Sequence, residues 1–231
     1  MGERITIKTE DGSFDAYVAR PKGAKAPAVV VIQEIFGVNQ VMRDITDGLA
    51  GQGYLAVCPD LFWRIEPGID ITDKSDAEWK RAFELFNAFD VDAGIKDIQA
   101  TINVIRGDPG ASGKVGAVGF CLGGLLAFLT ATRTDIDAAV SYYGVGLDGR
   151  VAEAEKLSKP LMLHIAEEDR FVPKPAQAII LAALKDQTLI EIHTYPGCDH
   201  AFARPDGEHY DEAAAKLAGG RSLAFFEKAL A

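Results

Sequence analysis

The sequence predicts an α/β protein in which a mostly parallel sheet carries helices on both faces. Short apolar runs rich in β-branched residues alternate along the chain with longer segments of helical pattern. Such runs are typical of strands covered on both faces, as in parallel sheets. No internal repeat, low-complexity tract or linker divides the 231 residues. We therefore expect one domain over residues 1–231.

The first half opens with a predicted antiparallel hairpin, which forms one edge of the sheet. Apolar and polar residues alternate from Ile5 to Val18, on both sides of the turn at Asp11-Gly12. The other expected elements of this half are strands at Ala28–Ile32 and Tyr54–Cys58, helices at Val38–Gln52, Ser75–Asn87 and Val91–Arg106, and an irregular stretch at Leu61–Thr72.

The second half repeats the alternation and contains one ambiguous segment. Val115–Thr132 is eighteen residues without a charge, which is the length of a short membrane span. The glycine pair Gly123-Gly124 in its middle favours a buried strand followed by a buried helix. The expected elements are strands at Val115–Phe120, Ala138–Tyr142, Leu161–Ile165 and Leu189–Tyr195, and helices at Leu122–Arg133, Pro175–Leu184 and Glu208–Ala229.

Composition and charge exclude some classes of binding partner and indicate a cellular compartment. With 34 acidic and 24 basic residues the net charge is −10, so phosphate backbones and anionic lipid repel the chain. Three cysteines cannot form a disulfide framework and fit a reducing compartment. The N-terminus becomes charged at once and has no apolar run of signal-peptide length after it. We expect a cytoplasmic monomer that binds neither nucleic acid nor membrane.

The most informative segment is Gly119-Phe120-Cys121-Leu122-Gly123-Gly124, between a predicted strand and a predicted helix. A nucleophile on a sharp strand-to-helix turn needs small neighbours two positions away, because the two backbones nearly touch there. The start of the helix also favours a thiolate. Cys121 is therefore the candidate nucleophile, and the alternative is a structural cysteine in a tight turn.

The other two cysteines are weaker candidates for the nucleophile than Cys121. Cys58 ends a core strand and is expected to be a small buried hydrophobe. Cys198 lies two residues before His200, but nothing nearby offers further ligands at zinc spacing. We therefore expect no metal site.

A thiol nucleophile needs a base and a carboxylate that orients it. His200 lies in a loop after a predicted strand, where ligands bind in open α/β sheets, whereas His164 and His193 lie inside strand patterns. Asp169 follows another buried strand, with Glu167 and Glu168 as alternatives that spacing cannot separate. The chain order of nucleophile, acid and base is that of the α/β-hydrolases.

At this point the chain resembles the dienelactone hydrolase (carboxymethylenebutenolidase) family, the small branch of the α/β-hydrolases that has a Cys-His-Asp triad and no cap domain. The resemblance runs almost from end to end and implies Cys121, Asp169 and His200 as the triad. It rests on the segments Gln33-Glu34-Ile35-Phe36-Gly37, Cys58-Pro59-Asp60-Leu61, Gly119 to Gly124, Tyr142-Tyr143-Gly144-Val145-Gly146 and His200-Ala201-Phe202-Ala203-Arg204.

The resemblance also implies roles for residues outside the triad. The glutamate at position 34 would hold the resting thiol neutral and take its proton when substrate binds; the alternative is a solvated loop carboxylate. The backbone N–H groups of Ile35 and Leu122 would form the oxyanion hole. Arg204 would pair with a substrate carboxylate, unless it is a solvated surface residue.

One departure from the family limits the substrate prediction. The family has an arginine and, four residues on, a tyrosine facing the pocket, where this chain has Trp79 and Phe83. The pocket would then be more apolar and have one cationic anchor fewer. These rings are either plain core or stack on a flat ester. The expected substrate contacts are Phe36, Trp79, Phe83, Tyr142 and Arg204.

The sequence therefore predicts a cofactor-free hydrolase that opens a carboxylate-bearing lactone through a cysteine acyl-enzyme. A broader carboxylesterase or thioesterase that acts on neutral or aryl esters is the alternative among enzymes. From another class, the alternative is a non-catalytic relative whose Cys121 senses redox state or holds a ligand.

Overall fold

The computed structural model describes residues 2–23 and 25–231, and the chain folds into two compact units, residues 1–117 and 118–231. The division falls inside strand β5 (Ala111–Phe120). The prediction of a single domain stays a prediction.

The N-terminal unit contains the antiparallel edge that the sequence predicts. Its strands follow the order β1-β2-β4-β3; β1 and β2 form the hairpin, β2 pairs antiparallel with β4, and β3 runs parallel to β4. β3 and β4 are almost wholly buried, which explains their unbroken apolar runs. The elements are β1 (Glu3–Thr9), β2 (Gly12–Ala19), β3 (Ala26–Ile32), β4 (Leu55–Pro59), α1 (Gln40–Gly51), α2 (Asp76–Ala88) and α3 (Val91–Arg106).

The C-terminal unit is built on parallel strands. β6 pairs parallel with β7, and β7 pairs parallel with β8. Its elements after β5 are α4 (Leu122–Arg133), β6 (Ala138–Tyr142), the 3-10 helix η1 (Leu147–Lys156), β7 (Leu161–Ala166), α5 (Lys174–Leu184), β8 (Ile190–Tyr195) and α6 (Glu212–Ala229).

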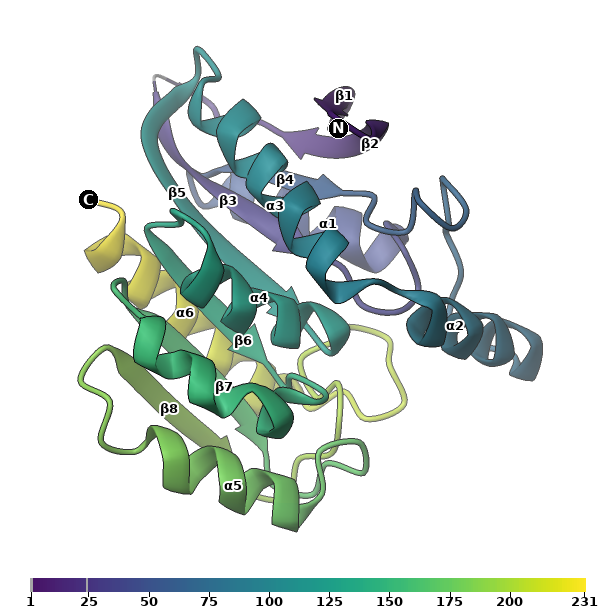
Figure 1. The fold of residues 1–231 in the computed structure, drawn as a ribbon, viewed down its shortest axis with the longest axis vertical. Coiled ribbons are helices and arrows are strands. Elements are labelled where there is room, and N and C mark those ends of the chain that lie inside the picture. Colours follow the sequence, from purple (N-terminus) through teal and green to yellow (C-terminus); the bar gives the residue numbers. More distant parts are fainter. Residues whose placement is uncertain (1, 24) are drawn as a thin grey trace. The chain divides into compact units, whose positions relative to one another are not determined.

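Helices cover both faces of the strands in each unit (Figure 1). In the N-terminal unit α3 is drawn in front of β3 and β4 and α1 behind them. In the C-terminal unit α4 and α5 lie in front of the strands, and α6 passes behind β6. The α/β class, the mostly parallel strands and the antiparallel N-terminal edge are thus confirmed. The longest connections, 60–75 and 196–211, are loops, so the described chain carries no insertion the size of a cap domain.

The ambiguous apolar segment is a core segment. It comprises the end of β5, the turn at Cys121 and helix α4, whose residues from Leu122 to Thr132 are all buried. Within residues 2–23 and 25–231, no helix is both long and apolar enough to cross a membrane.

Three element predictions need correction. β5 begins at Ala111, four residues before its first unbroken apolar run, and α6 begins at Glu212 and not at Glu208. Asp211 caps α6 by accepting a hydrogen bond from Ala214 N, so residues 208–211 are loop. The helix η1 was not expected, because it buries only Leu147 and Ala154 and therefore has no apolar periodicity.

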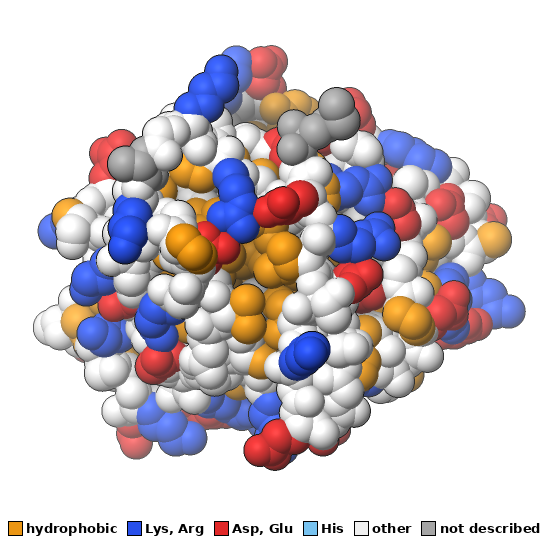
Figure 2. Space-filling view, turned by 90° about the horizontal axis from the view of Figure 1, so that it is seen from above, with side chains coloured by type: hydrophobic (Ala, Val, Ile, Leu, Met, Phe, Trp, Pro, Cys, Tyr) orange, Lys and Arg blue, Asp and Glu red, His pale blue; other side chains and the backbone are white. Residues whose placement is uncertain are grey.

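Charged side chains of both signs are interspersed on the face drawn in Figure 2. This face therefore has no broad area of one sign, although the chain as a whole is acidic. That nucleic acid and membrane are not partners stays a prediction.

Candidate active site

Cys121 lies on the sharp turn between β5 and α4 that the glycine pattern predicts. Its φ of 58° and ψ of −114° lie where residues other than glycine are rarely found, so the backbone is strained there. The turn is held by the end of β6 and the loop after it: Cys121 N donates to Tyr142 O at 3.1 Å, and Val145 N donates to Cys121 O at 3.3 Å. The surrounding fold thus fixes the nucleophile candidate in a single backbone conformation.

The helix that starts at this turn shapes the electrostatics around the thiol. Leu122 is the first residue of α4, and the first N–H groups of a helix have no acceptor inside it. They carry partial positive charge, which favours an anion beside Cys121. The Leu122 N–H predicted for the oxyanion hole is one of these groups.

The structure brings His200 to both Cys121 and Asp169. His200 Nδ1 lies 2.9 Å from Asp169 Oδ2 and 3.0 Å from Oδ1, and both side chains are buried. Asp169 Oδ1 also accepts from the N–H groups of Phe171 and Val172, which orients the carboxylate. The His200 ring makes a hydrogen bond to the Cys121 side chain as well. Because Nδ1 is hydrogen-bonded to Asp169, Nε2 is the ring nitrogen that can bond the sulfur of Cys121.

The two glutamates that spacing left open do not hold His200. The N–H groups of Glu167 and Glu168 donate to Tyr195 O and Cys198 O, which extends the pairing of β7 with β8. The Glu168 side chain forms an exposed ion pair with Lys174. The hydrogen bonds therefore select Asp169 as the partner of His200.

Opposing effects set the pKa of His200. Burial alone lowers it, but the negative charge of Cys121 and the hydrogen bond to Asp169 raise the pKa of His200 to about 10. This balance favours the protonated form of the His200 ring at neutral pH.

Two aromatic residues that sequence reasoning missed enclose the His200 ring. Tyr143 and Phe171 approach it edge-on, with ring centroids 5.0 Å and 4.9 Å away. The only sequence signal for them was their position next to Tyr142 and near Asp169. Their packing against the His200 ring limits how far that ring can turn.

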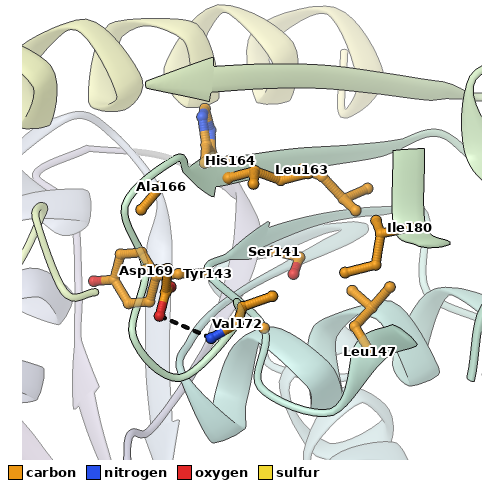
Figure 3. A pocket seen from close by; sticks show the side chains of 11 residues that line it. Ser141, Tyr143, Leu147, Leu163, His164, Ala166, Asp169, Val172 and Ile180 are labelled. Atoms are coloured by element: carbon orange, nitrogen blue, oxygen red, sulfur yellow. Dashed lines mark hydrogen bonds between the residues drawn. The ribbon is translucent and has the colours of Figure 1, made fainter. Parts of the chain in front are cut away.

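A cavity of about 10 Å³ lies behind the carboxylate of Asp169. Figure 3 shows Asp169 and Tyr143 at one end of it and the apolar side chains of Leu147, Leu163 and Ile180 at the other. The dashed line is the hydrogen bond from Val172 N to Asp169. The cavity is close to the smallest size that holds one water, so it is too small for an ester substrate.

Two further predicted residues of the C-terminal unit are buried. Arg204 is 8% exposed, which argues against the solvated surface alternative. Tyr142 is buried with its hydroxyl 2.7 Å from Ser222 Oγ, and its carbonyl accepts from Cys121 N. These hydrogen bonds join it to the turn and to α6, its ring packs against Phe120 and His164, and its predicted contact with substrate stays a prediction.

The predicted residues of the N-terminal unit follow β3. Glu34 is 2% exposed, so the alternative of a solvated loop carboxylate is wrong, and Ile35 is buried beside it. Gln33 braces this segment, because its Oε1 accepts from Leu61 N at 3.0 Å. The roles of Glu34 and Ile35 stay predictions.

Phe36, Trp79 and Phe83 form an aromatic ladder within the N-terminal unit. The Phe36 and Trp79 centroids lie 5.1 Å apart in an edge-on contact, and those of Trp79 and Phe83 lie 5.6 Å apart in a stacked one. Trp79 Nε1 donates to Asp73 O, and Phe83 is 41% exposed. Phe83 is therefore not plain core.

The remaining cysteines are buried and reduced. Cys58 is fully buried, as predicted, and Cys58, Cys121 and Cys198 are all free thiols. Across the part of the chain that the structure describes, no three His, Cys, Asp or Glu side chains gather as they would around a metal ion.

Comparison with known proteins places this geometry in a family. The sequence profile of the dienelactone hydrolase family matches residues 14–230. The chain belongs to this family. A protein of Azospirillum brasilense, provisionally named a carboxymethylenebutenolidase, is 55% identical over 96% of both chains. The carboxymethylenebutenolidase of Pseudomonas putida is 42% identical over 97% of this chain and 96% of its own.

A solved structure has the same fold over almost the whole length of this chain. The crystal structure of a provisionally named dienelactone hydrolase from Klebsiella pneumoniae superposes with a TM-score of 0.86 at 30% identity, and covers 99% of this chain and 98% of its own. The fold of the dienelactone hydrolase family, predicted from the motifs, is thereby confirmed. The chain is a carboxylic ester hydrolase of this family.

Proposed function

We propose that this dienelactone hydrolase family member opens a carboxylate-bearing lactone by acyl transfer to Cys121. The observation that carries the proposal is the hydrogen-bonded series from Cys121 through His200 to Asp169. A thiol at a strained turn, a buried base and a carboxylate that fixes the tautomer of that base are the parts that thiol acyl transfer needs.

In the first step the Cys121 sulfur attacks the lactone carbonyl and a carbon–sulfur bond forms. The negative charge moves to the carbonyl oxygen, where the N–H groups of Leu122 and Ile35 are the proposed donors. The ring carbon–oxygen bond then breaks, and the His200 imidazolium gives its proton to the departing ring oxygen. The product of this step is a thioester that still carries the opened chain.

Acylation prepares His200 for the second step. The thioester carries no charge on sulfur, so the largest of the interactions that raise the pKa of His200 is lost, whereas the burial that lowers it remains. The ring becomes neutral and can take a proton from water. The resulting hydroxide attacks the thioester, the carbon–sulfur bond breaks, and the diacid leaves. The thiolate that is released then takes back the proton held by Glu34.

Glu34 belongs to the proposal as the group that keeps the resting thiol neutral and takes its proton when substrate binds, which gives the thiolate that attacks the carbonyl. Its burial supports this role, because a carboxylate inside the protein needs a specific interaction. A thiolate made only on demand also resists oxidation. The single domain, the monomeric state and the cytoplasmic location stay predictions alongside this proposal.

Arg204 is the proposed anchor for the substrate carboxylate. Its guanidinium is buried, where ion pairing with an anion is stronger than at the surface. The names of the Pseudomonas putida and Azospirillum brasilense relatives support a substrate of the dienelactone type.

The aromatic ladder of Phe36, Trp79 and Phe83 favours a second candidate, an esterase for neutral aryl esters. Stacked rings with an exposed end suit flat apolar groups and add no cationic anchor. The chemistry at Cys121 would be the same, and only the substrate would differ.

The proposal is tested by steady-state hydrolysis of dienelactone isomers and of p-nitrophenyl acetate, with and without iodoacetamide. We expect Cys121→Ala to lower kcat for dienelactone by at least about 1,000-fold. Cys58→Ala, which removes a buried thiol elsewhere, should keep both the activity and its sensitivity to alkylation. Wild-type turnover by Cys121→Ala would overturn the proposed nucleophile.

The same assay separates the candidates. Dienelactone turnover that disappears on alkylation supports the lactone proposal. Thiol-dependent cleavage of p-nitrophenyl acetate without dienelactone turnover would favour the aryl esterase. No hydrolysis of either ester would favour a thiol that senses redox state or holds a ligand.

A further inference from the structure

Asp199, the residue before His200, connects the two loops that carry His200 and Asp169. Its Oδ1 accepts from His200 N at 2.6 Å and from Arg170 N at 3.1 Å. Its Oδ2 accepts from Arg170 Nε at 3.2 Å and lies 3.8 Å from His209 Nε2. A single carboxylate therefore contacts both loops.

The contacts of the two aspartates are reciprocal. Asp169 binds the side chain of His200, the residue after Asp199, and Asp199 binds the backbone and side chain of Arg170, the residue after Asp169. The aspartate of each loop thus binds the residue that follows the aspartate of the other loop. This crossed arrangement fixes the spacing of the two loops where His200 meets Asp169.

The loop needs such support at this place. The backbone bonds that extend the β7–β8 pairing end with Glu168 N to Cys198 O. Directly after His200, Ala201 has a φ of 63°, which is strained for a residue with a Cβ. His200 therefore lies between a strained residue and the Asp199 carboxylate, and a strained conformation persists only where neighbouring contacts hold it.

We propose that Asp199 is a positioning residue for the acyl-transfer reaction: by bonding His200 N and Arg170 N it holds the His200 ring where it reaches both Cys121 and Asp169. This inference rests on the proposed function of Cys121. Asp199 contacts no reacting atom, so its effect on the rate is exerted through the orientation of His200. A displacement of about 1 Å in such a group costs up to about 100-fold in rate.

The test compares Asp199→Ala and Asp199→Asn with Asp211→Ala. Asp211 is a matched control, because its carboxylate also accepts a backbone N–H, that of Ala214 at the start of α6, and has no contact with His200 among the hydrogen bonds described. For each variant we would measure kcat and KM for a neutral ester, the rate at which iodoacetamide alkylates Cys121 between pH 5 and 9, and the melting temperature.

We expect Asp199→Ala to lower kcat by about 10- to 100-fold with little change in KM. Alkylation of Cys121 at neutral pH should slow, because a displaced His200 ring no longer assists the reaction of the sulfur with iodoacetamide. Asp199→Asn should recover most of kcat, since its amide oxygen can still accept both N–H groups. Asp211→Ala should lower the melting temperature and leave kcat and the alkylation profile unchanged.

Three results would overturn the inference. These are wild-type kcat and alkylation in Asp199→Ala, an equal loss of kcat in Asp211→Ala, and a loss in Asp199→Asn as large as that in Asp199→Ala. Failure of the proposed function looks different, because the wild-type enzyme would then keep its turnover after Cys121 is alkylated.

Discussion

Gly119 and Gly123 approach each other so closely across the strand-to-helix turn that a Cβ on Gly119 would overlap the carbonyl oxygen of Gly123. Neither backbone can withdraw easily, because Gly119 lies in β5 and Gly123 in the buried first turn of α4. The sharp turn at Cys121 therefore requires that Gly119 has no side chain.

The first prediction concerns this contact. Gly119→Ala should destabilise the protein by about 3 kcal/mol or more, because the new methyl group meets backbone and not a movable side chain. Gly220→Ala is the matched control: Gly220 lies inside α6 with open space around its Cα, so the same substitution should stabilise by about 0.5–1 kcal/mol. Urea denaturation of both variants checks this, and equal stability would contradict it.

The second prediction concerns the substrate carboxylate. Arg204→Gln should raise KM for carboxylate-bearing lactones by about 10- to 100-fold, the loss expected for one charge-assisted hydrogen bond, and should change KM for p-nitrophenyl acetate little. Arg204→Lys keeps the charge but loses the bidentate geometry, so its KM for lactones should be intermediate. Equal effects on the charged and the neutral substrate would remove the anchoring role.

The third prediction concerns stability against pH. His164 is buried, with Nδ1 2.7 Å from Tyr195 Oη and Nε2 3.0 Å from Ser222 Oγ. Burial, with smaller effects of the positive charges of His193 and Arg221, holds the pKa of His164 well below 6.5. The folded chain thus binds fewer protons than the unfolded chain, so this contribution is present above pH 6.5 and is lost as the pH falls below it.

His200 acts in the opposite direction. Although burial lowers its pKa, the charge of Cys121 and the bond to Asp169 raise it to about 10, so its contribution is full below pH 6.5 and is lost as the pH rises from 6.5 toward 10. The two histidines together place maximum stability near pH 6.5. Below that pH the free energy of unfolding should fall by up to about 1.4 kcal/mol per pH unit because of His164.

Urea denaturation between pH 5 and 9 checks this prediction. His164→Gln should be less stable than the wild type at pH 7.5 and should lose less stability between pH 6.5 and 5.5. A slope on the acid side that His164→Gln leaves unchanged would show that another group is responsible.

Much of this fold was predictable because its signals are local. The buried strands are continuous apolar runs, and glycines two positions before and after Cys121 indicate the turn there. Helix η1 escaped prediction because its packing buries only two side chains. The selection of Asp169 over Glu167 and Glu168 by hydrogen bonding, and the contacts of Asp199 with Arg170, depend on how two loops meet in space, which spacing along the chain does not record.

The two ends of Tyr142 link the nucleophile to helix α6. Its carbonyl receives the Cys121 N–H, and its hydroxyl meets Ser222 in the middle of α6. During synthesis Cys121 leaves the ribosome about a hundred residues before Ser222 does, so a nascent chain carries the thiol before it has the helix that holds Tyr142 in place. Docking of α6 is then a maturation step, and we expect the cysteine to become reactive toward esters only when the chain is long enough to include that helix.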